Sequence, residues 1–474
     1  MAEFRVESDS MGEINLPEWA YWGAQTQRAV ENFQISGIPL PVPMIRAIAL
    51  IKKNAAKANA ELGLVDGELA DAIVQAADEV IGGKWDRHFP IDVFQTGSGT
   101  SSNMNTNEVI SNRANEILGQ PIGKRHPVHP NDHVNRGQSS NDVIPTAVQV
   151  SNRIEAEQLV LALGDLAAAF REKEREFADI LKLGRTHLQD AVPMTLGQEF
   201  SVYALQMEKA RDRIKATFAN LEELPLGGTA IGTGLNTHPD FARLAVEGIA
   251  RDSGISFRPA DNKFEGIAAR DAQVEFMGAL NVLATALMKI GNDLRLLASG
   301  PRGALGEIVL PSLQPGSSIM PGKVNPVIPE MLIQVAAHIH GKVLSVTMGG
   351  QNAPLELNMM NPLIAYEVLG SIAILTNAVK TLADKAVRGT VADVERCRHW
   401  IDWSLAMVTP LALKVGYDEA TRLAYKAYKE KKKIREVVLE AGIKAWEGMG
   451  QGMGPASLVK KFLEKEGEQV IWTR

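Results

Sequence analysis

The sequence predicts a mostly α-helical protein whose centre is a bundle of long helices. The strongest observation is a series of apolar residues spaced alternately four and three apart: Phe276, Leu280, Leu283, Leu287, Ile290, Leu294 and Leu297. This spacing forms the seam of a helix that packs almost parallel to its neighbours. The other faces carry Ala279, Val282 and Ala286, so the helix is expected to be buried on all sides. One chain of this size could bury it, but an oligomeric bundle does so more naturally.

Three further stretches have the same spacing and are expected to be long helices of this bundle. Their apolar residues are Leu159, Leu163, Leu166 and Phe170; Tyr203, Met207, Ala210 and Ile214; and Ile372, Leu375, Val379, Leu382 and Ala386. Only 5% of the residues are aromatic, so aliphatic side chains must supply most of the core.

Composition narrows the class of protein. The chain has 474 residues, of which 45% are hydrophobic, so it can bury a large core in two or three domains. A net charge of -6 argues against a nucleic-acid partner. The single cysteine, Cys397, cannot form an intrachain disulfide and is expected to be a small buried apolar residue in a reducing compartment.

Targeting and membrane segments are not expected. The first residues, MAEFRVESDSMGEINLPEW, have no apolar core for a signal peptide and are too acidic for a transit peptide. The most apolar predicted helices are interrupted by charges such as Glu275, Lys289 and Glu367, so no membrane span is predicted. We therefore expect a cytoplasmic protein.

The remaining segments complete the predicted order. Residues 1 to about 40 are mixed with short extended and turn-like stretches, and helices are expected near 43–61 and 66–80. The segments 82–90 and 121–141 are expected to be irregular, and short charged helices follow residue 395. These changes predict three domains: a mixed, mainly helical domain at 1–138, the long-helix bundle at 139–395 and a small helical domain at 396–474.

Four polar loops precede or connect the predicted helices and hold residues suited to chemistry. They are Gly97 to Asn107, His126 to Asn141, Gly184 to Asp190 and Gly316 to Asn325. The first is a string of small residues that runs into a helix start, where free backbone N–H groups favour a phosphate or a carboxylate. In the second, Ser139, Ser140 and Asn141 are expected to cap a long helix.

The fourth loop, GSSIMPGKVNP, has the richest chemistry. Its prolines and glycines exclude a helix or a central strand. It contains two adjacent hydroxyls, Ser317 and Ser318, a cation, Lys323, and an amide, Asn325. A surface turn needs the prolines and glycines but has no use for this polar set.

A metal or cofactor site is not predicted. Four potential ligands lie close together in the sequence: His126, His129, Asp132 and His133. However, Pro127 and Pro130 break the helix that would align them. The GTG of LPLGGTAIGTGLNT lacks the third glycine and the β-α-β context of a dinucleotide fingerprint. A metal-dependent hydrolase built on the loop histidines stays open as an alternative.

His187 lies among polar neighbours, in the string GRTHLQD. A lone histidine is more often structural than catalytic, but an apolar core would not select these neighbours, so both interpretations stay open. The four loops together suit an anionic small molecule held by hydroxyls, amides and cations. They also suit acid–base chemistry by a hydroxyl and a histidine.

Taken together, these strings resemble the fumarase/aspartase superfamily, and most closely the class II fumarases. The resemblance covers nearly the whole chain and rests on YWGAQTQRAVENF, TGSGTSSNMNTNEV, HPNDHVN, SSND, GRTHLQDA and the superfamily signature GSSIMPGKVNP. It implies a mostly α fold of three domains in a homotetramer. Long helices from four subunits would form a twenty-helix core, and each active site would use loops from three subunits. It implies no metal and no cofactor.

The resemblance also implies residue roles. Ser317 would be the catalytic base, His187 would transfer a proton on the side of the leaving hydroxyl, and Glu330 would support the histidine. The residues that would hold a dicarboxylate are Ser98, Gly99, Thr100, Ser139, Ser140, Asn141, Thr186, Ser318, Lys323 and Asn325. A second anion site would comprise His129, Pro130, Asn131 and Asp132.

The implied reaction is the reversible hydration of fumarate to L-malate in the tricarboxylic acid cycle. Removing a proton beside a carboxylate places two negative charges on one carboxyl group, the aci-carboxylate. Lys323, Asn325 and backbone N–H groups would stabilise this species more than the ground state. Ser317 is a poor base unless its alkoxide is stabilised, which Lys323 and loop N–H groups could do.

The leaving group distinguishes fumarases from aspartases. Ammonia leaves without help from an acid, whereas hydroxide needs a proton. The resemblance to aspartases is weaker because they typically have Gln where this chain has His187, and read AGAGT and MPAKVNP where it has TGSGT and MPGKVNP. Shared strings such as VPMTLGQEF and NPVIPE keep aspartate ammonia-lyase as an alternative. A non-catalytic structural member of the superfamily is a second one, although Ser317 and His187 are both present.

Overall fold

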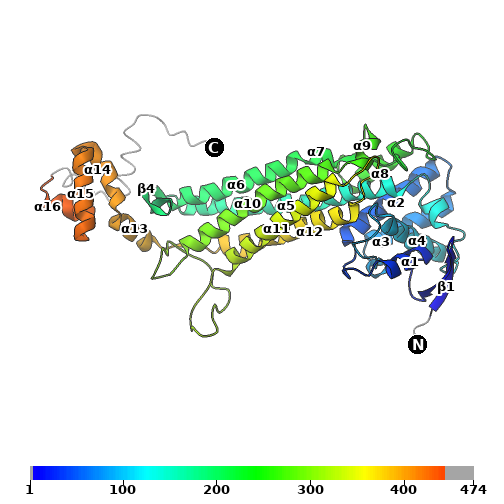
Figure 1. Ribbon diagram of the computed structural model, residues 1–474, viewed down its shortest axis with the longest axis horizontal. Helices are drawn as coiled ribbons and strands as arrows, with labels where there is room; N and C mark the ends of the chain where they lie inside the picture. Colours follow the sequence, from blue (N-terminus) through cyan, green and yellow to red (C-terminus); the bar gives the residue numbers. More distant parts are fainter. Residues whose placement is uncertain (1–3, 444–474) are drawn as a thin grey trace. The chain divides into compact units, whose positions relative to one another are not determined.

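The computed structural model describes residues 4–443 and is dominated by helices (Figure 1). The N-terminal helices are α1 (Ala24–Asn32), α2 (Val42–Glu61), α3 (Gly67–Ile81) and α4 (Thr100–Ile117). The long helices are α5 (Ser140–Glu176), α6 (Leu196–Ala216), α10 (Asp271–Leu297), α11 (Val327–Gln351) and α12 (Asn361–Leu382). Shorter helices are α7 (Phe218–Leu221), α8 (Phe241–Ser253), α9 (Lys263–Ala268), α13 (Val394–Trp403), α14 (Val408–Val415), α15 (Tyr417–Glu430) and α16 (Ile434–Glu440). Single turns of other helix types occur at Asp86–His88, Pro130–Val134, Ala383–Val387 and Leu405–Met407.

Strands are short and occur in pairs. The hairpins are β1 (Phe4–Asp9) with β2 (Gly12–Pro17), and β3 (Leu181–Thr186) with β4 (Gln189–Thr195). Two-residue strands pair as β5 (Glu223–Leu224) with β6 (Arg258–Pro259), in parallel, and β7 (Ile308–Val309) with β8 (Val391–Ala392), antiparallel. The mostly α fold class predicted from the sequence is confirmed.

The described chain divides into two compact units, each assembled from three stretches. The first comprises residues 4–162, 210–285 and 335–377, and the second 163–209, 286–334 and 378–443. Within each unit, the segments of α5, α6, α10, α11 and α12 run alongside one another (Figure 1). The division does not follow the order of the chain, because the long helices contribute to both units.

In the first unit, long helices contact each other through close backbone approaches and polar pairs. A Cβ at Gly350 of α11 would lie 2.7 Å from Val274 of α10, and one at Gly349 would lie 2.9 Å from Ile364 of α12. Lys342 of α11 donates to Glu367 of α12 over 2.6 Å. Glycine therefore allows α11 to approach two neighbours.

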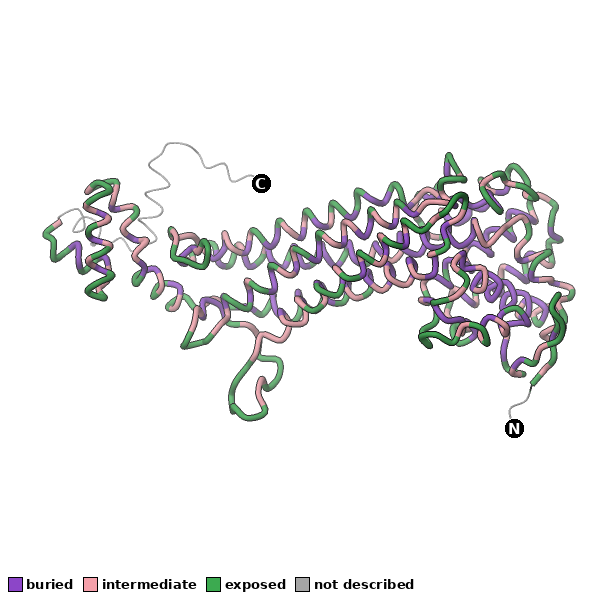
Figure 2. Tube along the Cα trace, in the orientation of Figure 1, coloured by how far each residue is buried: buried purple, intermediate pink, exposed green. Residues whose placement is uncertain are grey.

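In the second unit, aromatic rings fill the space between α5 and α6. The rings of Phe170 and Tyr203 are 5.6 Å apart, and those of Phe170 and Phe200 are 6.1 Å apart. Arg171 of α5 donates to both carboxylate oxygens of Glu208 on α6, each over 2.8 Å. Figure 2 shows buried residues recurring along each long helix, as the four–three spacing predicts.

Two helical stretches are long and strongly apolar: α10, and α12 together with the turn Ala383–Val387 that follows it. Asp271–Leu297 and Asn361–Val387 are long and apolar enough to cross a membrane by length and composition alone. Their most apolar stretches are 50% and 61% buried inside the protein, as the core helices of a folded domain are. Charges within these stretches, such as Glu275 and Glu367, are the reason that the sequence predicts no membrane span there.

Helix α1 (Ala24–Asn32) lies within the first 40 residues, for which the sequence predicts only short extended and turn-like stretches. Its first turn is held by a buried carboxylate, Glu108 of α4. That carboxylate accepts from the backbone N–H groups of Gly23 (2.8 Å) and Thr26 (3.2 Å) and from the Thr26 hydroxyl (2.6 Å). A carboxylate satisfies the free donors at a helix start, and this tertiary contact is not visible in local sequence.

Cys397 is fully buried, as predicted, and its burial raises the pKa of its thiol to about 12. The small C-terminal helices share an apolar core that includes Leu411, Leu423 and Val437. Part of the predicted C-terminal domain, residues 444–474, lies outside the described residues.

His88 provides a test of this packing through pH. It is fully buried, its Nδ1 accepts from the Tyr21 N–H over 3.1 Å, and its ring lies 5.4 Å from those of Trp19 and Trp85. Burial lowers its pKa to about 4, from 6.5. The unfolded chain therefore binds a proton between pH 6.5 and 4 that the folded chain excludes, and stability falls as the pH is lowered through this window.

We expect His88→Asn to flatten this part of the dependence of Tm on pH, since an amide oxygen can accept from Tyr21 without titrating. Thermal unfolding at pH 7.5, 6 and 4.5 measures it, with the exposed His399→Asn as the control. An acid slope unchanged by His88→Asn would contradict the assignment.

Candidate active site

Two of the predicted loops meet at a cluster of hydroxyl groups in the first unit. Ser98 Oγ and Thr100 Oγ1 are 2.8 Å apart, and Thr100 Oγ1 and Ser140 Oγ are 2.7 Å apart. Gly99 lies between them with φ 75°, as the residue before α4. A Cβ at Gly99 would lie 2.8 Å from Ile144 of α5, so glycine permits both the left-handed backbone and the close contact. The helix starts of α4 and α5 are therefore joined by their hydroxyls.

The start of α5 is held by hydrogen bonds to a third segment, LGGTA at 226–230. The sequence analysis considers this stretch only as a dinucleotide fingerprint, which it rejects. The buried Asp142 carboxylate accepts from Ser139 N–H (2.9 Å), Gly227 N–H (3.0 Å) and Thr229 N–H (2.9 Å). Asn141 Nδ2 donates to the Ala230 carbonyl over 2.8 Å. Burial raises the pKa of Asp142 to about 6.

The LGGTA segment thus positions Asn141, a role that local sequence could not reveal. Its paired glycines, Gly227 and Gly228, were the available signal, because a carboxylate can approach backbone N–H groups closely where side chains are absent.

The predicted second anion segment forms one turn, Pro130–Val134, capped by its own histidine. His129 Nδ1 accepts from the N–H groups of Asn131 and Asp132, each over 3.2 Å. The N–H of His129 in turn donates to His133 Nδ1 over 2.8 Å. These contacts occupy the Nδ1 atoms of both rings. Among residues 4–443 there is no group of three or more His, Cys, Asp or Glu side chains placed to hold a metal ion.

A buried lysine contacts the residues that follow this turn. Lys52 is fully buried, and its Nζ donates to Asn135 Oδ1 (2.8 Å) and Gln138 Oε1 (3.0 Å). Burial lowers the pKa of Lys52 to about 7. The ammonium group therefore joins two residues of the segment between the Pro130–Val134 turn and the start of α5.

In the second unit, His187 lies at the tip of the β3–β4 hairpin. The sequence analysis treated this segment as a polar loop, but Thr186 pairs with Gln189 and leaves His187 and Leu188 as a two-residue turn. Their φ values are 55° and 60°, the left-handed pair that a type I′ hairpin requires and that Asn and Gly usually supply. His187 is exposed at this strained tip, so it is not a packed core residue. Strain of this kind is concentrated at functional sites.

The Ser317 loop is closed on itself by backbone and amide contacts. The Gly316 N–H donates to the Lys323 carbonyl over 2.7 Å, and Asn325 Nδ2 donates to the Gly316 carbonyl over 2.6 Å. A Cβ at Gly316 would lie 2.6 Å from the Lys323 carbonyl oxygen, so only glycine fits the closure. Asn325 is therefore, in this structure, the residue that clasps the two ends of the loop.

Ser317 lies inside this closed loop. Its Oγ accepts from the N–H groups of Ile319 (3.2 Å) and Met320 (3.0 Å). Two N–H donors aimed at a hydroxyl oxygen favour its deprotonated form, which a serine base requires. Ser318 and Lys323 are exposed beside it, and Glu330 lies in the first turn of α11. Among the described residues of this unit, no hydrogen bond or ion pair joins His187 to Ser317, Lys323 or Glu330.

Comparison with known proteins places this helical chain among the lyases. A family profile described as Lyase matches residues 12–341, and one described as Fumarase C C-terminus matches residues 407–459. The chain belongs to this lyase family and, within it, to the class II fumarases.

Individual relatives agree along nearly the full length. The chain is 47% identical to the class II fumarate hydratase of Thermus thermophilus, over 97% of this chain and 99% of that one. It is 47% identical to the mitochondrial fumarate hydratase of Rattus norvegicus, over 96% and 90%. The solved class II fumarase of Schistosoma mansoni superposes with a TM-score of 0.92 at 40% identity, over 96% and 99%. A fumarate lyase:delta crystallin of Brucella melitensis bound to cobalt also gives 0.92, at 45% identity over 97% and 99%.

Proposed function

We propose that this chain is a hydro-lyase that interconverts fumarate and L-malate. Its relatives over nearly the full length are named class II fumarate hydratases. The observation that carries the mechanism is the Ser317 hydroxyl, which accepts from two backbone N–H groups in a loop that also presents Lys323. That environment suits an oxygen that must work as a base.

The proposed mechanism has two proton transfers, one at C3 of malate and one at the hydroxyl group on C2. Ser317 Oγ takes a proton from C3 of malate, and the electron pair is delocalised into the neighbouring carboxylate as the aci-carboxylate. The C2–O bond then breaks, with a proton from His187 converting the departing hydroxide to water. Fumarate and water are the products, and the reverse sequence hydrates fumarate. Lys323 and loop N–H groups stabilise the doubly charged carboxyl group, the task for which a single donor typically contributes about a hundred- to a thousand-fold in rate.

The remaining predicted ligands fit a dicarboxylate. The Ser98, Thr100 and Ser140 hydroxyls, 2.7–2.8 Å apart, present donors at the starts of two helices, which favour an anion. We keep Ser139, Asn141, Thr186 and Ser318 as further substrate contacts, Glu330 as support for His187, and the His129–Asp132 turn as a second anion site.

The proposed assembly is a homotetramer with a twenty-helix core and active sites shared between three subunits. Apolar side chains exposed on the long helices support it: Leu161, Val202, Leu205, Val282, Leu344 and Met348. Leu161 and Leu344 are each 63% exposed in the single chain, which a buried bundle helix would not leave to water. We also keep the division into domains 1–138, 139–395 and 396–474 and the cytoplasmic location as proposals.

Ultraviolet absorbance tests the proposed reaction, because fumarate has a conjugated double bond that malate and aspartate lack. We expect absorbance to rise when the chain is mixed with L-malate and to stay flat with L-aspartate. A rise with aspartate alone would instead identify an ammonia-lyase. No rise with either would favour a structural member of the superfamily.

A further inference from the structure

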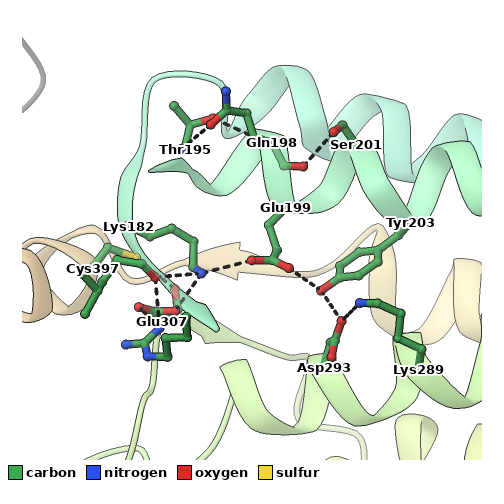
Figure 3. A network of polar contacts seen from close by, with 12 residues as sticks. Lys182, Thr195, Gln198, Glu199, Ser201, Tyr203, Lys289, Asp293, Glu307 and Cys397 are labelled. Atoms are coloured by element: carbon green, nitrogen blue, oxygen red, sulfur yellow. Dashed lines mark hydrogen bonds and ion pairs between the residues drawn. The ribbon is translucent and has the colours of Figure 1, made fainter. Parts of the chain in front are cut away.

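Arg270 is a buried cation that the proposed mechanism does not use. It lies directly before α10 and is 3% exposed. Among the described residues, its hydrogen bonds all go to neutral oxygens and none goes to a carboxylate. The buried Lys182 of the second unit differs, because it donates to Glu199 over 3.1 Å and lies 3.6 Å from Glu307 (Figure 3). Burial lowers the pKa of Arg270 to about 9, so a charge at this position costs free energy.

The contacts of this guanidinium group fall into two sets. The first set is at the end of α9, where the group donates to the carbonyls of Gly266 (2.8 Å), Ile267 (3.0 Å) and Ala269. Carbonyls at a helix end lack partners within the helix, so these contacts stabilise the end of α9. The other contact points away from α9, because Nε donates to Asn361 Oδ1 over 2.6 Å. Asn361 is the first residue of α12, so the guanidinium group joins the end of α9 to the start of α12.

The start of α12 in turn contacts the loop that carries the hydroxyl cluster. The Asn361 N–H donates to the Gly97 carbonyl over 3.1 Å, and Asn361 Nδ2 donates to the Asn358 carbonyl over 2.9 Å. A Cβ at Gly97 would overlap the Met359 carbonyl oxygen, so only glycine allows the loop to lie this close to the segment before α12. The residue after Gly97 is Ser98, the first member of the hydroxyl cluster. The position of Asn361 therefore determines where the loop lies.

We propose that Arg270 is a positioning residue for the substrate site. It holds the loop of Ser98 and Thr100 in place through Asn361, to which the loop is hydrogen-bonded. This inference rests on the proposed function, in which the hydroxyls of that loop bind a carboxylate group of the substrate. All of these residues belong to the first unit of one chain. The role also accounts for an arginine at this position, because a lysine ammonium has only three donors for the four acceptors that the guanidinium group contacts.

Substrate affinity distinguishes positioning from simple stabilisation of the fold. A displaced hydroxyl cluster weakens the binding of a dicarboxylate and therefore raises the KM for L-malate. A loss of folded protein lowers the amount of active enzyme and hence the apparent kcat, but it leaves KM unchanged. Succinate is a dicarboxylate without a hydroxyl group to eliminate, so its Kd, measured by calorimetry, reports the same affinity without turnover.

We expect Arg270→Gln to raise the KM for malate and the Kd for succinate about ten-fold, the effect of losing one hydrogen bond to a charged group, with a smaller change in kcat. Arg270→Lys keeps the charge but has fewer donors, so its affinity should lie between those of Arg270→Gln and the wild type. The matched control is Arg153→Gln, which removes another buried arginine of the first unit, one that donates to Glu157 and Glu222. It should change neither KM nor Kd.

Asn361→Ala provides a second variant in case Arg270→Gln does not fold, because it keeps the guanidinium group and its contacts with α9. We expect a similar loss of affinity. The double variant should bind succinate about as well as the weaker single variant, since the two residues act through one connection. Unchanged affinity in the folded single variants, or losses that multiply in the double variant, would overturn the positioning role and leave the proposed function intact. A wild-type chain that does not dehydrate malate would refute both.

Discussion

Replacing Ser317 by alanine is expected to lower two rates by about a hundred- to ten-thousand-fold. One is dehydration of malate, and the other is C3 labelling, the exchange of the C3 proton of malate for deuterium in deuterated water without breaking the C2–O bond. The substitution removes the oxygen that accepts from Ile319 and Met320 and that would take the C3 proton. Both reactions begin with that transfer, so their ratio should stay close to the wild-type value. Deuterium incorporation by mass spectrometry and fumarate absorbance in the same samples measure the two rates.

Ser312→Ala is the matched control, because Ser312 is an exposed serine on the same connection before the loop. It should leave both rates unchanged. Labelling that continued at the wild-type rate in Ser317→Ala would assign the base to another group.

Replacing His187 by glutamine is expected to lower dehydration by roughly a hundred-fold or more while C3 labelling persists. Glutamine can keep a hydrogen bond but cannot deliver a proton to the leaving hydroxide. The ratio of labelling to dehydration should therefore rise. The same two assays measure it.

His399→Gln makes the equivalent change at an exposed histidine of α13 and should have no effect. A His187→Gln variant that dehydrates malate at the wild-type rate would remove His187 from the mechanism. Equal loss of labelling and dehydration would place it at the first step instead.

The long helices were predictable because their signal is local and repeated. The α10 seam from Phe276 to Leu297 needs only the helical period and burial, and all seven of its apolar residues are buried as expected. The β3–β4 hairpin was missed because its turn residues, His187 and Leu188, are not those a type I′ turn normally selects. Local rules expect Asn or Gly at these two positions, so they give no signal for a turn made of His and Leu.

The sequence predicts which loops form the candidate site, but it does not predict the contacts that hold those loops in place. The strings around Ser98, Ser140 and Ser317 predict which loops carry chemistry, and the roles of their residues stay a prediction. Three contacts show this: Asp142 accepts from the LGGTA segment, Glu108 from the start of α1, and Glu307 from Arg185 of β3. Each joins residues more than 70 positions apart in the sequence. Contacts between residues so far apart are determined by tertiary packing, so a single sequence gives no signal for them.

The way in which each compact unit is assembled from separate stretches has a consequence for synthesis on the ribosome. The first unit needs residues 335–377 as well as 4–162, so 377 of the 474 residues must be made before it can close. At a translation rate of about 5–20 residues per second, the N-terminal helices wait roughly 10–40 s for their last partner. Apolar faces such as that of α2 are exposed to the cell during this interval. The nascent chain is therefore expected to depend on holding chaperones, and a slow codon cluster before residue 335 should lower its yield more than one after residue 377.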